Sequence, residues 1–398
     1  MRQFKLFALV LPLVLVLAAA SGHAVTNSAC EANLLHKILA HFTGEPDDGP
    51  LGEALRKSPE LLYDDGGEHP EAFPFFASNE FDWFTAPVDT SPTDVVIGFG
   101  TNSAWDIASR KQAKSLIVGD YVAGPLISQR YILRPLLRIA KSPADFLLLL
   151  MALPTKDDSV RTLDDFSQYK QSKLRSLDRS QILAGMNANL DRLHASGASY
   201  EEIMAVTEHY KAIYSPSIKD QFGVLRGLGA HANGHLGLYF TKRYLPENMI
   251  AGGAKADIVR SPEFSFLSSQ AAFERFQKLY ATSLLAQTDY SSEEFYKRVK
   301  ARGDALGYTR YTFSLTNILD VATTNKASAM SLLEDYRRMI YRIFPADKYN
   351  VVIMLTTNCS PPHGFIRLER GQAVDPNQWI YTAPREPQSV ATARPRAS

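Results

Sequence analysis

From residue 94 onward the chain alternates short apolar runs with segments of helical periodicity, and this alternation most constrains its fold. Apolar runs of this length are typical of buried strands in a parallel sheet. Strands separated by helices need crossover connections, so the pattern predicts an α/β fold with a mostly parallel sheet. The predicted strands are residues 94–98, 115–119, 146–151, 283–288, 309–315 and 350–356, with a closing pair at 364–368 and 378–381.

Residues 25–93 precede this alternation and have a different character. Helical spacing of apolar residues occurs at 30–42, and a second short helix is predicted at 51–62. The segment that follows is rich in proline, glycine and aromatic residues. We therefore expect an N-terminal helical and loop extension that packs on the sheet domain.

Residues 156–262 interrupt the alternation. Amphipathic patterns at 179–195 and 200–214 predict that this region is a mostly helical insertion outside the sheet. The α/β core is then expected to comprise residues 94–155 and 263–382, and the tail at 383–398, rich in proline, arginine, alanine and serine, is expected to be disordered.

Residues 1–24 have the features of a cleavable secretory signal peptide. Arg2 and Lys5 precede an apolar run at 6–20, and small residues ending at Ala20 and Ala24 offer cleavage sites. The run is shorter than the ~20 residues that span a bilayer comfortably. No later segment is long and apolar enough to do so, so we expect an exported protein, periplasmic or secreted, without a transmembrane segment in the mature chain.

The chain has two cysteines, Cys30 and Cys359. In an oxidising compartment they could form a disulfide, and two buried free thiols are the alternative. Two other anchoring hypotheses remain open: an uncleaved N-terminal anchor, and a lipoprotein modified at Cys30.

The charge balance argues against nucleic acid as a partner. Lys and Arg total 43 and Asp and Glu total 42, so no broad basic field is expected. No nucleic-acid partner is expected, a small-molecule ligand is possible, and the sequence does not determine the oligomeric state.

The strongest local motif is Gly98-Phe99-Gly100-Thr101-Asn102, directly after the first predicted strand. Glycine tolerates positive φ and lets a ligand approach the backbone, and amide groups at a following helix start can hold a negative group. Asp120 closes the next predicted strand, where doubly wound nucleotide sites place an acidic residue that accepts hydrogen bonds from a ribose. The spacing is compatible with a nucleotide-type pocket, but two glycines alone are weak evidence, and a glycine turn that simply joins strand to helix is the alternative.

A set of segments in this order resembles an exported bacterial family without an assigned activity, whose core is similar to class I S-adenosylmethionine-dependent methyltransferases. The segments are residues 95–136, Ser265-Phe266-Leu267, the strand ending at Asp289, and residues 311–317. The resemblance implies a Rossmann-like, methyltransferase-like sheet with a cofactor-sized cleft at its strand ends.

The same resemblance implies roles for individual residues and S-adenosylmethionine as the cofactor. Gly98, Gly100 and Asn102 would line its methionine and ribose side, and Asp120 would accept hydrogen bonds from the ribose hydroxyls. Ser314 and Asn317 would face the cleft from the end of a later strand.

Two other constellations are weaker candidates. His231 and His235 have the spacing of metal ligands on one helix face, but the surrounding glycines disfavour a helix, so no metal is expected. Arg130 and Arg134 are one helical turn apart and could bind a phosphate or carboxylate, although a salt-bridged or solvated face is the favoured interpretation.

Two functions remain open on the sequence. The first is a methyltransferase-like enzyme, or a degenerate one, that binds S-adenosylmethionine or another nucleoside-containing ligand. The second is a non-catalytic secreted or envelope binding protein built on a degenerate methyltransferase-like scaffold. The predicted export counts against S-adenosylmethionine as a methyl donor, because extracytoplasmic spaces are not expected to supply it. The core could therefore have been reused for another ligand, since fold alone does not fix function.

Overall fold

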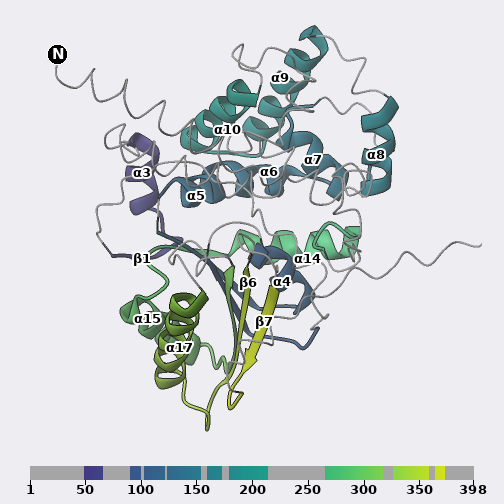
Figure 1. Cartoon of the computed structure of the whole chain (residues 1–398). Helices are drawn as coiled ribbons and strands as arrows, with labels where there is room; N and C mark the ends of the chain where they lie inside the picture. The colour runs from purple at the N-terminus through teal and green to yellow at the C-terminus, as the bar shows by residue number, and fades with distance from the viewer. Residues whose placement is uncertain are drawn as a thin grey trace, which may run out of the picture.

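Seven strands form one sheet in the order β1-β4-β3-β2-β5-β6-β7 (Figure 1). The computed structural model describes residues 49–65, 90–99, 103–121, 123–153, 159–172, 179–213, 265–316, 326–357 and 364–372. The strands are β1 (Leu61–Asp64), β2 (Val95–Phe99), β3 (Ser115–Asp120), β4 (Leu284–Gln287), β5 (Arg310–Thr316), β6 (Asn350–Thr357) and β7 (Gly364–Glu369).

All neighbouring strands are parallel except β6 and β7, which are antiparallel. From β2 the chain proceeds through β3 to β4 on one side, and then returns through β5 to β6 on the other. The strand order therefore reverses between β2 and β5, which is the place where ligands bind in open α/β sheets. The prediction of an α/β, Rossmann-like fold is confirmed.

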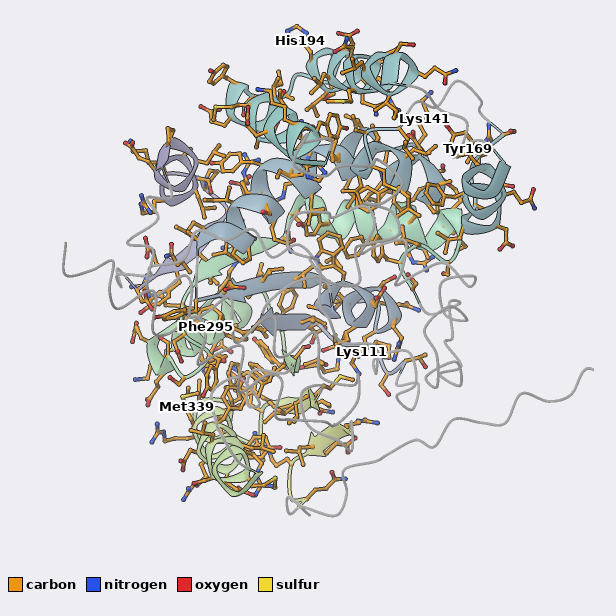
Figure 2. The ribbon with its side chains drawn as sticks, turned by 45° about the horizontal axis from the view of Figure 1, so that its top comes forward. Lys111, Lys141, Tyr169, His194, Phe295 and Met339 are labelled. Atoms are coloured by element: carbon orange, nitrogen blue, oxygen red, sulfur yellow. The ribbon has the colours of Figure 1, made fainter. Side chains whose placement is uncertain are left out.

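Helices cover both faces of the sheet, because its strands carry apolar side chains on both sides. In β2, for example, every residue is buried. Val96 and Val118 pack into one hydrophobic core with α4 (Ser103–Arg110) and α14 (Gln270–Ala281). Val95 and Ile97 face a second core, which α15 (Glu293–Ala305) and α17 (Lys326–Ile343) complete. Figure 2 shows the side chains of these two helices, with Phe295 and Met339 labelled, gathered together beside the sheet.

A further layer of helices lies beyond α4 and α14 (Figure 1). It comprises α3 (Gly49–Arg56), α5 (Ala123–Ser128), the π-helical turn η2 (Gln129–Leu133), α6 (Arg134–Ile139), α7 (Pro143–Leu150), α8 (Leu163–Ser172), α9 (Arg179–Ala195) and α10 (Tyr200–Ile213). The last three are the described parts of the predicted insertion, and they are helical as expected. The π-helical turn η2 continues directly into α6 at Arg134, and Pro135 lies in the first turn of α6.

The prediction of a strand at 146–151 is wrong, because this segment belongs to α7. Every residue of α7 is buried, so the helix has no polar face and its apolar run resembles a strand. The signals for a helix lie just before the run. The side chain of Ser142 accepts a hydrogen bond from the Asp145 backbone amide, and Pro143 occupies the first turn.

The helix predicted at 51–62 ends early, at Arg56, and Leu61 begins the edge strand β1. Pro59 disfavours helical geometry in the residue before it, which explains the break. Several predictions fall outside the described residues: the signal peptide, Cys30 and Cys359, the His231–His235 pair, the segment at 378–381 and the C-terminal tail.

Candidate functional site

Three of the predicted site residues lie at the carboxyl edge of the sheet. Gly98 of β2 is in register with Ser314 of β5 on one side and with Val118 of β3 on the other. Asp120 is the last residue of β3. Because these strands are parallel, their carboxyl ends meet at the point where strand order reverses. The other three predicted residues, Gly100, Asn102 and Asn317, lie outside the described part of the chain.

Gly98 lies inside β2, where it is packed against α4. A Cβ at this position would stand 2.2 Å from the Cβ of Ala104, in the first turn of α4. Gly98 is not among the described glycines with positive φ. The glycine is therefore needed for the close approach of helix and strand, which brings the beginning of α4 to the carboxyl end of β2.

Ser314 is fully buried, and its hydroxyl has no hydrogen-bond partner among the described residues. Its Cβ lies 3.9 Å from the position that a Cβ on Gly98 would occupy, so its side chain is on the α4 face of the sheet. A buried hydroxyl left without a partner costs about 1–3 kcal/mol. A polar ligand atom at the switch point would remove that cost.

Asp120 is only partly buried, and its carbonyl oxygen accepts a hydrogen bond of 2.8 Å from the Thr288 amide. Across the sheet it is in register with Gln287 of β4, which is in turn in register with Asp64 of β1. The Gln287 side chain is buried, and its Oε1 accepts no hydrogen bond within the described residues. Gln287 was not predicted; the available signal was a polar residue at the end of an apolar strand.

The opposite face of the sheet is closed at this edge. A Cβ on Gly119 would lie 2.7 Å from the Phe99 ring, so that ring covers the end of β3. Phe99 makes edge contact with Phe295, with ring centroids 5.9 Å apart. At the end of β3 this face is therefore covered by an aromatic ring, whereas Ser314 lies on the α4 face.

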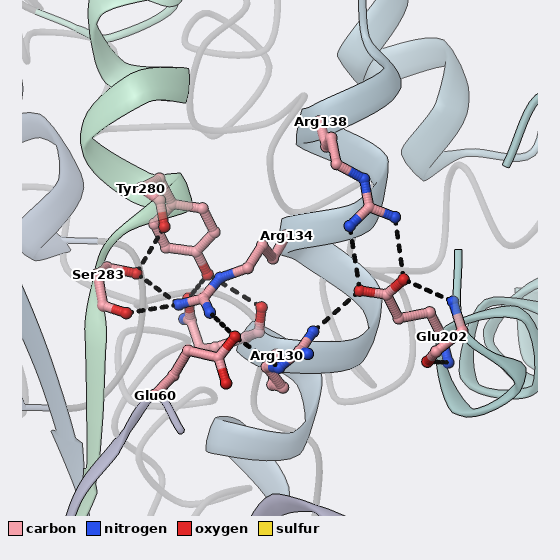
Figure 3. Close-up of polar contacts among 9 residues, drawn as sticks. Glu60, Arg130, Arg134, Arg138, Glu202, Tyr280 and Ser283 are labelled. Atoms are coloured by element: carbon pink, nitrogen blue, oxygen red, sulfur yellow. Dashed lines mark hydrogen bonds and ion pairs between the residues drawn. The ribbon is translucent and has the colours of Figure 1, made fainter. Parts of the chain in front are cut away.

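The Arg130–Arg134 pair belongs to a separate polar network between the helical layer and β1 and β4 (Figure 3). Nη2 of the buried Arg134 donates to the Ser283 carbonyl oxygen at 2.7 Å and to its hydroxyl at 2.8 Å. Nη1 of Arg134 lies 3.1 Å from Glu60 Oε1. Burial lowers the pKa of Arg134, while the nearby Tyr280 and Glu60 oppose this shift.

Glu202 is the second acidic centre of this network. It accepts hydrogen bonds from Arg130 at 2.9 Å and from Arg138 at 2.9 and 3.3 Å. It also forms a capping box at the start of α10, because its Oε2 accepts from the Ser199 amide while its own amide donates to the Ser199 hydroxyl. Burial alone would raise the pKa of Glu202, but the hydrogen bonds from Arg138, Ser199 and Arg130 bring it below its usual value. The salt-bridged interpretation of the arginine pair therefore agrees with the structure.

Two searches of the described residues gave negative results. No group of three or more His, Cys, Asp or Glu side chains within them is arranged to hold a metal ion. None of the helices in that part of the chain is long and apolar enough to cross a membrane.

The candidate site is therefore the carboxyl edge of the sheet at β2, β3 and β5. Ser314 and Asp120 are its polar groups, and Gly98 allows α4 to pack closely on β2. Neither the models of known protein families nor the curated protein sequences include a match to this chain.

Proposed function

We propose that the protein binds a nucleoside-containing small molecule at the carboxyl edge of its sheet, and that S-adenosylmethionine is the first candidate. The observation that carries this proposal is the buried, unsatisfied hydroxyl of Ser314 beside Gly98, at the point where strand order reverses. Asp120, at the end of the adjacent β3, would accept hydrogen bonds from the ribose diol.

The described residues fit part of such a ligand. A half-buried carboxylate suits a pair of ribose hydroxyls, and a buried serine hydroxyl suits one further polar group. Gly98 offers no room of its own, because Ala104 occupies the space beside it. When bound, S-adenosylmethionine would supply an electrophilic methyl group. The role of this protein would be to orient the ligand through Asp120 and Ser314.

Asp120→Ala is expected to weaken binding of the nucleoside ligand at least tenfold, because a hydrogen bond to a charged acceptor contributes about 1.5–3 kcal/mol. Stability should change little, since the side chain is only partly buried. Calorimetry with S-adenosylmethionine, S-adenosylhomocysteine and adenosine measures the effect. The matched control is Asp335→Ala on α17, where the exposed carboxylate pairs with Arg338, and binding should be unchanged.

Two results would contradict this proposal in different ways. If none of the three compounds gave a heat of binding with the wild-type protein, the proposal of a nucleoside ligand would be wrong. Binding that survives in Asp120→Ala would show that the ligand lies elsewhere.

The second candidate is a non-catalytic binding protein on the same scaffold. It is favoured by the composition of the edge: among the described residues at the ends of β2 to β5 there is no His, Cys or Lys to act as a base or nucleophile. Native mass spectrometry of the purified protein distinguishes the candidates, because a retained ligand without a nucleoside would favour this one.

Export is part of both candidates. Expression of the full chain in a bacterium should yield a mature form that begins near Ser21 or Val25, because the apolar run and the small residues after it suit signal peptidase. N-terminal sequencing of the soluble protein measures this directly. An intact Met1 on that protein would show that no cleavage takes place.

A further inference from the structure

The carboxyl end of β4 carries a polar side chain that the proposed function does not use. Gln287 is the last residue of this strand and is 5% exposed. No described residue donates a hydrogen bond to its Oε1. A buried acceptor without a donor destabilises the folded protein, because it has lost its hydrogen bonds to water. A ligand that donates a hydrogen bond to this oxygen would remove that cost.

Gln287 and Asp120 lie side by side on one face of the sheet. They are paired in the parallel register of β3 and β4. The pair two residues earlier, Val118 and Leu285, packs into the core on the α4 side of the sheet. Because side chains alternate between the two faces along a strand, Asp120 and Gln287 point toward that same side. Their positions are separated by one strand spacing, about 4.8 Å.

The two side chains differ in charge. Asp120 is a carboxylate, whereas Gln287 offers the oxygen of a neutral amide. A second carboxylate beside Asp120 would be repelled by it, whereas a neutral acceptor is not. On its other side Gln287 is in register with Asp64 of β1. An amide at this position therefore adds an acceptor to the edge of the sheet without adding a further negative charge.

Two acceptors at this spacing suit two adjacent hydroxyl groups. O–H···O hydrogen bonds are about 2.7–2.8 Å long, so each acceptor can take one hydroxyl of a cis-diol while the two hydroxyls stay next to each other. Ser314 lies on β5, and β2 separates that strand from β3. Ser314 is therefore left to hold another part of the ligand.

We propose that Gln287 determines the sugar specificity of the nucleoside site, by accepting a hydrogen bond from one ribose hydroxyl while Asp120 accepts from the other. This inference rests on the proposed function, because it concerns the same ligand. The pair of acceptors selects a nucleoside with a complete cis-diol over a deoxynucleoside. Loss of either hydroxyl leaves one of the two acceptors without its donor, and sites built to bind a hydroxyl reject analogues that lack it.

Calorimetric titration of the full chain with adenosine, 2′-deoxyadenosine and 3′-deoxyadenosine tests this inference. Wild-type protein should bind adenosine about tenfold or more tightly than either deoxynucleoside. Gln287→Met keeps the length of the side chain and removes the acceptor, so it should weaken adenosine binding about tenfold. It should leave unchanged the binding of one deoxynucleoside, the one that lacks the hydroxyl held by Gln287. The matched control is Gln270→Met, at an exposed position of α14, which should change none of these affinities.

The outcomes separate this inference from the proposed function. Equal binding of all three nucleosides by the wild type would overturn the role of the diol and leave the nucleoside site in place. Equal weakening of all three by Gln287→Met would show that the residue only supports the fold, and would overturn the inference as well. If the wild type bound S-adenosylmethionine but not adenosine, the pair of diol acceptors would be wrong. If it bound neither, the nucleoside site itself would be wrong, and this inference with it.

Discussion

Gly98→Ala is expected to reduce the free energy of unfolding by about 3 kcal/mol, at the upper end of the usual cost of overpacking a core. The new methyl group would lie 2.2 Å from the Cβ of Ala104 in the first turn of α4, and a Cβ has no side-chain rotation by which to move away. To accommodate it, α4 must move off β2, and this movement opens the core around the buried Trp105. Urea denaturation of the full chain measures the change.

Ala104→Gly provides the matched control for this prediction. Alone it should cost about 1 kcal/mol, because glycine is a poor helix former. Combined with Gly98→Ala, it removes the opposing methyl group, so the double variant should be more stable than Gly98→Ala. If Gly98→Ala were as stable as the wild type, the close contact of helix and strand described here would be incorrect.

Asp94→Asn is expected to reduce the free energy of unfolding by a similar amount, about 2–4 kcal/mol. The substitution removes the negative charge that Arg310 and Lys114 contact. Asp94 is 3% exposed and accepts hydrogen bonds of 3.0 Å from the Thr309 and Arg310 amides, in addition to its ion pairs with Arg310 and Lys114. It therefore holds the beginning of β5 against the beginnings of β2 and β3. Thermal and urea unfolding at neutral pH measure the loss.

The same carboxylate predicts a dependence on pH. Burial would raise the pKa of Asp94, but hydrogen bonds from Arg310, Lys114 and the two amides outweigh burial and hold it well below its usual value. A pKa lower in the folded than in the unfolded state stabilises the fold above about pH 4 and ceases to do so as the pH falls below that value. Stability of the wild type should therefore decline with acid more steeply than that of Asp94→Asn. Parallel declines would contradict this assignment.

Much of the sheet could be predicted because its strands are local apolar runs. Five of the six predicted strands occur, with no bound shifted by more than one residue. The sixth, at 146–151, is a helix buried on every side, which periodicity cannot distinguish from a buried strand. β1 was missed because Leu61 and Leu62 continue the helical spacing that precedes them, and only pairing with β4 makes them a strand.

The site was predicted less completely, for a physical reason. A strand end can be found locally, so Asp120 and Ser314 could be assigned to strands from the sequence, and they lie in β3 and β5 near the carboxyl ends of these strands. The contacts of Asp94 join residues more than 200 positions apart, and those of Glu202 join separate helices. Such partners depend on register and packing, which no local pattern encodes.

The arginine network has a consequence for how the molecule opens. Glu202 joins α10 to Arg130 and Arg138, while Glu60 and Ser283 join Arg134 to the strands β1 and β4 that follow them. Separation of the helical layer from the sheet would leave the buried guanidinium group of Arg134 without its partners Glu60 and Ser283. We therefore expect the layer and the sheet to unfold together in one cooperative step. Backbone amides of α6 and β4 should then exchange hydrogen with solvent at similar rates.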